Sequence, residues 1–266
     1  MTSRQRLISF DLKAEMGFFK KPDINDGLYL TYNLLHKPAL LGIIGAITGM
    51  EGYKKNGVFP EYYKKFKHLK VGISPLDSDK GDYTKIVIRY NNSTGFASNE
   101  NGGNLIVAEQ TLIKPSYRCF LLLSLDDKDE LALYDNILSY KAEFLPYMGK
   151  NDFSAWWTDA REYNSFEKFD FNQDYKIASI FTKTGIVSDC ITHSISMFHE
   201  KSKDILFLYF EKLPIDLNGR DKNGNQLYQY SYADFVYSNA SFKKEMNMSE
   251  TGEFYQIEEN CIIQLF

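Results

Sequence analysis

Cysteine is scarce in this sequence, and its scarcity excludes several classes of protein. The three cysteines, Cys119, Cys190 and Cys261, are too few and too widely spaced for a disulfide framework or a zinc site. The longest apolar segment, 39–50, is too short to cross a bilayer, and residues 1–19 lack the apolar core and cleavage site of a signal peptide. We therefore expect a cytoplasmic protein that makes no contact with a membrane.

The common motifs of phosphate binding, metal binding and covalent catalysis are also missing. The sequence contains neither GxxxxGK[ST] nor GxGxxG, and neither GxSxG nor HExxH. The histidines are His36, His68, His193 and His199, and none of them has the spacing of a metal ligand. The sequence therefore predicts no metal, no cofactor and no catalytic nucleophile.

Charge is unevenly distributed along the chain. The net charge is -4, but residues 1–120 hold 17 Lys and Arg against 11 Asp and Glu, and residues 121–266 hold 14 against 24. The balance is thus +6 in the first part and -10 in the second. Such asymmetry either indicates a basic surface that faces a polyanion or reflects ordinary variation among solvated side chains.

The segment 31–49, TYNLLHKPALLGIIGAITG, predicts a helix with an almost bare face. Pro38 suits the first turn, and Ala39, Gly42, Gly45, Ala46 and Gly49 recur at spacings of three and four. Each helical glycine costs about 0.8–1 kcal/mol relative to alanine, so we expect another backbone or a ligand to approach closely. Either the helix lies tightly on a sheet, or its polar entry, containing Thr31 and Lys37, binds an anion.

A second informative segment is a hairpin that projects from the fold. The strands 85–90 and 105–112 flank a stretch of turn-forming residues, 91–104. A hairpin that buries little of itself usually contacts a partner. We call residues 85–113 the projecting hairpin, and we expect its base to be lined by Arg89, Asn91, Asn92, Gln110, Lys114, Tyr117 and Arg118.

The remaining pattern predicts an α+β fold. We expect strands over 6–12, 69–74, 117–125, 176–181, 191–199 and 204–210, helices near 60 and over 126–140, and a turn at 218–225, with 153–157 open between strand and helix. This order approximates a ferredoxin-like β-α-β-β-α-β core with an inserted hairpin. We divide the chain into residues 1–150, which form the core, and residues 151–266, a β-rich part that completes it or packs on it.

Three functions compete on the residues alone. A cationic path with interleaved aromatic residues, as in the first 120 residues, fits RNA binding without cleavage. A metal-independent endoribonuclease would need a general base and a cation, for which Tyr32, His36 and Lys37 are the candidates. The third possibility is a protein-interaction module whose glycine-containing helix packs on its own sheet.

Several stretches together resemble one protein family. They are RLISFDLKAEMGFFKKPD, TYNLLHKPALLGIIGAITGMEGY, KIVIRYNN, NLIVAEQTLIKPSYR and LPYMGKN, in order over residues 6–151. They resemble the CRISPR-associated Cascade subunit that binds the 5′ handle of the guide RNA (crRNA), which is the fifth Cas family of the RAMP superfamily. The similarity is greatest to its type I-B branch and is looser after residue 151.

The resemblance implies an RNA-recognition-like fold in which the projecting hairpin is a thumb. It implies a non-catalytic subunit for antiviral defence that caps the 5′ handle of crRNA. It also implies that the thumb meets the Cascade backbone subunit, that the large subunit is a neighbour, and that target DNA is contacted indirectly. From the residues and the resemblance together, the expected RNA contacts are Lys20, Lys21, Thr31, Tyr32, Asn33, His36, Lys37, Gly42, Arg89, Asn91, Asn92, Gln110, Lys114, Tyr117, Arg118 and Lys150.

The resemblance also bears on catalysis. A type I-C branch of the family cleaves repeat RNA with a tyrosine and an adjacent Lys-His pair after the thumb. The matching segment here, 112–117, reads LIKPSY and has no such pair. We therefore expect a separate endoribonuclease to supply the processed guide.

Overall fold

The computed structural model describes residues 4–22, 27–54, 57–78, 80–91, 106–183, 207–220, 226–244, 252–258 and 261–266. A four-stranded antiparallel sheet lies at its centre, with the strand order β5-β8-β1-β9. The elements of this core are β1 (Gln5–Ala14), α1 (Lys37–Ile47), β5 (Lys70–Pro75), β8 (Ser116–Ser124), α3 (Lys128–Leu138) and β9 (Ala155–Tyr163). The chain is thus a mixed fold of antiparallel sheets with few helices, as the sequence predicted.

The alternation of residues along β1 explains why both faces of the sheet are covered. Ile8, Phe10 and Leu12 belong to the largest buried cluster, which includes the apolar residues of α1 and α3. Leu7 points to the opposite face, where Tyr163 and the strand pair β16 (Glu253–Glu258) and β17 (Cys261–Leu265) form a second cluster. Helices therefore cover one face of the sheet, and a strand pair covers much of the other.

The edge strand β9 is irregular. Its pairing with β1 shifts in register between Ser9 and Asp11. Opposite this shift, Asp159 has a φ of 52°, which a regular strand residue does not adopt. The edge of the sheet is therefore bulged in the middle.

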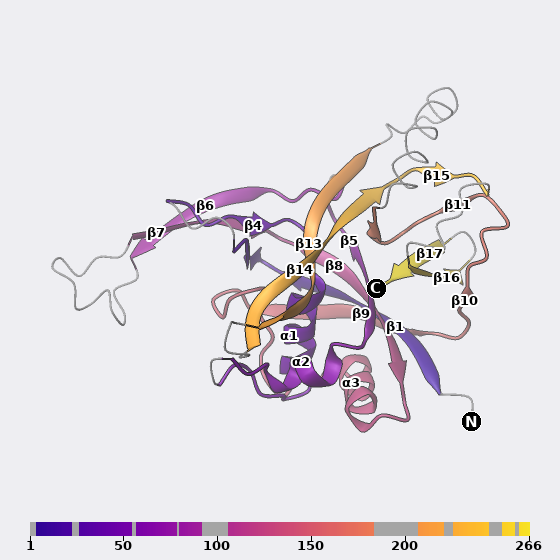
Figure 1. Cartoon of the computed structure of the whole chain (residues 1–266), viewed down its shortest axis with the longest axis horizontal. Coiled ribbons are helices and arrows are strands. Elements are labelled where there is room, and N and C mark those ends of the chain that lie inside the picture. Colours follow the sequence, from indigo (N-terminus) through magenta and orange to yellow (C-terminus); the bar gives the residue numbers. More distant parts are fainter. Residues whose placement is uncertain are drawn as a thin grey trace.

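The projecting hairpin extends away from the central sheet (Figure 1). Its strands are β6 (Lys85–Asn91) and β7 (Ile106–Ile113), and the tip predicted between them lies outside the described residues. The short strand β2 (Met16–Gly17) pairs with the base of β7, and β3 (Phe19–Lys20) pairs with β4 (Thr31–Tyr32) just before α1. Residues 16–20 therefore connect the base of the hairpin to the start of α1.

In the described residues of the second part of the chain, every regular element is a strand. It contains β10 (Glu167–Lys168), β11 (Tyr175–Lys176), β12 (Phe181–Thr182), β13 (Leu208–Arg220), β14 (Gln226–Ser238) and β15 (Ser241–Phe242). The long β13–β14 hairpin lies beside α1 (Figure 1), and its Leu213, Leu217 and Phe235 join the main buried cluster. A short helix, α2 (Glu61–Phe66), packs against α1 on another side.

Three expected strands differ from the structure or cannot be fully compared with it. The continuous strand expected over 176–181 is wrong: Lys176 ends β11 and Phe181 begins β12, and these two strands lie in different sheets. Between them, Ile177 forms an isolated bridge to Ile262, and the N–H of Ile180 donates to the carbonyl of Ile73. The segment 191–199 lies outside the described residues, as does the start of 204–210. The segment 153–157, left open above, leads into β9.

Candidate functional site

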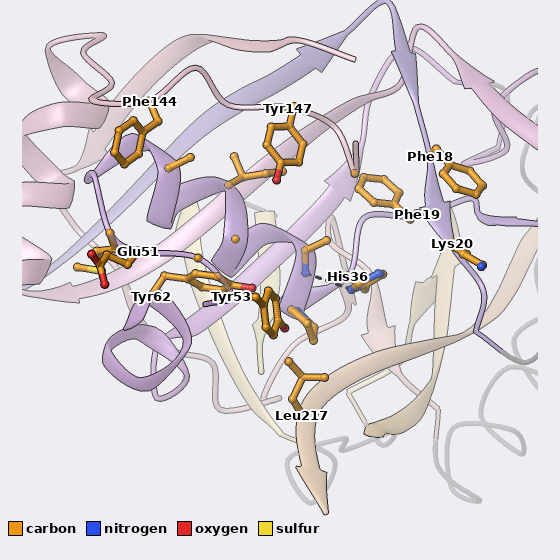
Figure 2. Close-up of a pocket in the computed structure, with 18 of the residues that line it drawn as sticks. Phe18, Phe19, Lys20, His36, Glu51, Tyr53, Tyr62, Phe144, Tyr147 and Leu217 are labelled. Atoms are coloured by element: carbon orange, nitrogen blue, oxygen red, sulfur yellow. Dashed lines mark hydrogen bonds between the residues drawn. The ribbon is translucent and has the colours of Figure 1, made fainter. Parts of the chain in front are cut away.

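A neutral histidine, His36, caps the N-terminus of α1. His36 precedes the helix in an extended conformation, and its Nδ1 accepts a hydrogen bond of 3.2 Å from the N–H of Ala39 (Figure 2). The ring lies among Phe19, Tyr32 and Tyr230 and is 4% exposed. Burial lowers the pKa of His36 to about 3, so the ring carries no charge at neutral pH.

The glycines of α1 have separate structural roles. A Cβ at Gly45 would overlap the Cβ of Tyr62 on α2, so this glycine allows two helices to pack closely. At Gly42 the nearest atoms of Tyr62 are 3.8 Å from where a Cβ would lie, which is an ordinary contact distance. The close approach at Gly45 is thus made by the Tyr62 side chain and not by the backbone or ligand expected from the sequence, and Gly42 borders open space.

That open space is a groove of about 740 Å³ along the small-residue face of α1. We call it the α1 groove. It is lined by Phe18, Phe19, Lys20, His36, Pro38, Ala39, Gly42, Ile43, Ala46, Met50, Glu51, Gly52, Tyr53, Lys54, Tyr62, Phe144, Leu145, Tyr147, Gly149, Leu217 and Tyr230. Figure 2 shows Phe144 and Tyr147 on one side of the helix, and Tyr53 and Tyr62 on the other.

The chemistry of the α1 groove suits flat ring systems. Its walls are aromatic, its floor consists of small residues, and the rings of Tyr53 and Tyr62 meet edge to face at 6.3 Å between centroids. Burial raises the pKa of the Tyr62 hydroxyl, so this residue is a neutral donor and acceptor. Lys20 and Lys54 also line the groove, and Glu51 pairs with Lys54. Aromatic side chains of this kind stack with unpaired nucleobases, and lysines attract phosphates.

The polar entry before α1 is bonded within the protein. Thr31 is buried and its Oγ1 accepts a hydrogen bond from the N–H of Phe19. The Asn33 side chain donates to the carbonyl of Gly81 and accepts from the N–H of Tyr83. Tyr32 is 3% exposed. These three predicted contact residues therefore present little surface to a ligand.

An anion already occupies the backbone donors at this entry. The Glu211 carboxylate on β13 accepts hydrogen bonds from the N–H groups of Asn33 at 3.0 Å and Leu34 at 2.9 Å. Lys21 lies 3.4 Å from the same carboxylate. Burial raises the pKa of the Glu211 carboxyl above its ordinary value. An external anion at this entry was one of the two alternatives that the sequence left open. In the structure, the carboxylate of the protein's own β13 fills that position.

Lys37 is also directed toward the protein. Its Nζ donates to the carbonyl oxygen of Phe266 at 3.2 Å, and burial lowers its pKa, partly opposed by the charge of Asp216. Of the three residues considered for RNA cleavage, Tyr32, His36 and Lys37, only His36 lines the α1 groove. The structure does not bring the three side chains together around the groove.

The predicted contacts on the projecting hairpin differ in exposure. Arg89, Asn91 and Lys114 are exposed, and Lys114 has a φ of 48° at the turn that leads into β8. Gln110 is half-buried and its Oε1 accepts a hydrogen bond of 3.4 Å from the N–H of Thr31. Asn92 lies outside the described residues.

Three further predicted contacts are engaged in internal interactions. Tyr117 is fully buried, and its hydroxyl donates to the carbonyl of Asn33 at 2.5 Å. Arg118 makes two hydrogen bonds with the carboxylate of Asp11, at 2.7 and 2.9 Å. Lys150 pairs with Glu109 at 2.6 Å. The Tyr117 side chain therefore cannot contact a ligand in this conformation, and the other two are largely neutralised.

Most of the groove's aromatic residues were not among the predicted contacts. Tyr53, Tyr62, Phe144, Tyr147 and Tyr230 come from four separate segments of the chain. The sequence signal that could have found Tyr53 and Tyr62 is their position within the basic stretch 54–70 or directly before it. Phe144 and Tyr147, which are 57% and 46% exposed, gave a different signal: aromatic residues beside the turn-forming Pro146 and Gly149.

Metal-binding clusters and membrane-spanning helices are both absent from the described part of the chain. Its His, Cys, Asp and Glu residues form no group of three or more that could hold a metal ion. Within the same residues, no helix combines the length and apolar character needed to cross a membrane.

Comparison with known proteins gives structural similarity without sequence similarity. No protein-family model and no curated protein matches the sequence. A chain of a CRISPR RNA-guided surveillance complex has a TM-score of 0.45 and 11% identity, over 88% of this chain and 90% of that chain. A CRISPR protein from Archaeoglobus fulgidus has a TM-score of 0.44 and 12% identity, over 97% of each chain. A chain of a type III-B Cmr-beta complex bound to cognate target RNA and AMPPnP has a TM-score of 0.41 and 11% identity, over 91% and 86%.

Proposed function

We propose that this protein is a non-catalytic RNA-binding subunit of a type I CRISPR surveillance complex, closest to type I-B, that caps the 5′ handle of crRNA. The observation that supports this most is the α1 groove, an aromatic cleft with lysines beside it, at one end of residues 16–20. The base of the projecting hairpin pairs with the other end of the same segment. The stretches that resemble the Cascade subunit run through these same elements.

The topology is compatible with the proposed family. The core elements follow the order β1-α1-β5-β8-α3-β9, and the strands lie in the order β9-β1-β8-β5. We assign this arrangement to a ferredoxin-like core with the projecting hairpin inserted between β5 and β8. In many RNA-recognition modules, bases stack on the exposed sheet face. Here β16 and β17 cover much of that face, which favours the α1 groove as the RNA site.

Binding in the groove would place bases inside and phosphates outside. The bases of a single-stranded handle would stack on Tyr53, Tyr62 and Tyr147, over the small residues of α1. His36 is neutral and its Nδ1 accepts a hydrogen bond, so its proton is on Nε2, and the nearly buried ring forms part of the groove wall. Lys20, Lys54 and the exposed Arg89 would face the phosphates.

The proposed neighbours follow from the same assignment. The projecting hairpin would meet the backbone subunit, and its exposed Ile86, Val87 and Ile106 give it an apolar surface for that contact. The large subunit would be the other neighbour, and target DNA would be reached through the complex. The cytoplasm is the expected location.

A matched pair of tyrosines tests the proposed groove. Tyr53 and Tyr140 are both 54% exposed, but only Tyr53 lines the α1 groove. We expect Tyr53→Ala to weaken binding of a 5′-handle RNA by roughly tenfold, because one stacked base is worth about 1–3 kcal/mol. Tyr140→Ala should leave the affinity unchanged. Fluorescence anisotropy with labelled handle RNA measures both, and equal affinities for the two variants would contradict the proposal.

A further inference from the structure

A buried carboxylate lies at the base of the projecting hairpin, and it has two specific partners. Glu109 on β7 is 2% exposed. Its Oε1 accepts a hydrogen bond of 2.6 Å from Nζ of Lys150, and its Oε2 accepts one of 3.1 Å from the hydroxyl of Tyr90 on β6. Both oxygens of this buried charge are therefore satisfied by side chains, which is the condition under which a buried ion pair is tolerated.

Lys150 is held in place by more than the ion pair. Its Nζ lies 4.7 Å from the ring centroid of Tyr90 and 4.9 Å from that of Phe153, and Asp152 is 3.4 Å away. Burial lowers the pKa of Lys150, but the hydrogen bond and the charge of Glu109 outweigh this effect, and the net shift is upward. The ammonium group is thus charged, directed inward and poorly placed to bind a phosphate.

The turn that carries Lys150 also forms a wall of the α1 groove. Tyr147 and Gly149 line the groove, and the N–H of Phe18 donates to the carbonyl of Met148 at 3.0 Å. Gly149 has a φ of 89°, and a Cβ there would overlap the carbonyl of Phe18. The turn is therefore packed tightly against residue 18, with the groove on one side and the hairpin base on the other.

Backbone hydrogen bonds to Tyr29 also hold the base of the hairpin in place. The N–H of Tyr29 donates to the carbonyl of Ala108 at 2.9 Å, and the N–H of Gln110 donates to the carbonyl of Tyr29 at 2.8 Å. Glu109 lies between these two bonds, and its ion pair with Lys150 links β7 to the turn.

We propose that Lys150 is a positioning residue, whose ion pair with Glu109 sets the orientation of the projecting hairpin relative to the α1 groove. It does not contact RNA itself. The inference rests on the proposed function for its consequence in binding, but the position of the hairpin can be measured without any RNA. It replaces the sequence-based expectation that Lys150 is an RNA contact.

The first test compares Lys150→Met with Arg89→Met. Handle-RNA affinity is measured between 50 and 200 mM salt, conditions that separate phosphate contacts from indirect effects. We expect Lys150→Met to weaken binding on the order of tenfold with an unchanged salt slope. Arg89→Met, on the exposed face of the hairpin, should weaken binding and lower the slope by about 0.7. A lowered slope in Lys150→Met would overturn the proposal.

The second test uses the sign of a charge change. Glu109→Gln removes a negative charge, which on electrostatic grounds alone would strengthen RNA binding. If the pair positions the hairpin, Glu109→Gln weakens binding instead, and amide hydrogen exchange in β6 and β7 becomes faster in both Glu109→Gln and Lys150→Met. Tighter binding by Glu109→Gln, or unchanged exchange in the two variants, would overturn the proposal. If the unmodified protein binds no handle RNA, the proposed function fails, and the exchange measurement still decides whether the pair holds the hairpin.

Discussion

The entry before α1 and the groove along α1 lie next to each other, yet they differ in what their residues contact. The entry, residues 31–37, is polar, and its groups are bonded to distant parts of the chain. The groove is lined by small and aromatic residues, and it remains open. From sequence alone the polar entry was the natural candidate for a ligand site, because its residues carry the donors and charges.

The difference shows that hydrogen-bonding capacity alone does not identify a binding surface. Buried donors and acceptors are nearly always satisfied, and here the partners are Glu211, Tyr83 and Gly81. Small residues on α1, in contrast, leave volume that the protein does not fill. The open site is therefore marked by missing side chains on one face and by aromatic residues contributed from elsewhere.

Removing the carboxylate at the entry should have the largest effect on stability. We expect Glu211→Ala to lower the free energy of unfolding by about 3 kcal/mol, because two buried N–H groups lose their acceptor. Glu211→Gln keeps an oxygen in place and should cost about 1 kcal/mol. Urea denaturation measures both. Equal stability of Glu211→Ala and the unmodified protein would mean that the entry is not held by this residue.

The two glycines of α1 give a finer comparison within the groove helix. Gly45→Ala should destabilise the protein by roughly 1–2 kcal/mol, since the overlap with Tyr62 outweighs the gain in helix propensity. Gly42→Ala, which meets no such overlap, should stabilise it by about 0.5–1 kcal/mol while narrowing the groove. Thermal unfolding measures the stabilities, and handle-RNA affinity should fall for Gly42→Ala despite its gain. A stability change of the same sign in both variants would contradict this assignment.

The pH dependence of stability tests the state of His36. The unfolded chain binds a proton on this histidine below about pH 6.5, whereas the folded protein does not until about pH 3. Stability should therefore fall as the pH is lowered from 6.5, by up to about 1.4 kcal/mol for each pH unit. Asparagine can also cap a helix, so His36→Asn serves as the reference. Identical pH profiles for the two proteins would show that His36 has the same pKa in the folded and unfolded states, and would contradict this prediction.

Much of the first part of the fold could be predicted because its signals are local. Apolar alternation marked β1, β6, β7 and β8. Asp126 and Asp127 were both possible caps for the helix predicted over 126–140, and in the structure Asp127 caps α3. The order of these elements followed directly. The short strands β11 and β12 could not be predicted as separate elements, because two-residue strands are defined by their neighbours and leave no periodic signal.

The roles of individual charged residues could not be predicted, because their partners are far away in sequence. Glu211 lies 178 residues after Asn33, and Asp11 lies 107 residues before Arg118. Arg118 and Lys150 therefore had the signature of exposed cations, although both are paired in the structure. The exposed Arg89 and Lys114, which the structure leaves at the surface, remain predictions as RNA contacts.

The bulge at Asp159 has a consequence for how copies of this protein behave at high concentration. An unpaired, regular strand edge is a template for intermolecular β-pairing, which leads to aggregation. The positive φ of Asp159 and the register shift opposite it break the run of outward-facing N–H and C=O groups along β9. Neighbouring molecules that meet at this edge are thus expected to remain separate rather than merge into one continuous sheet.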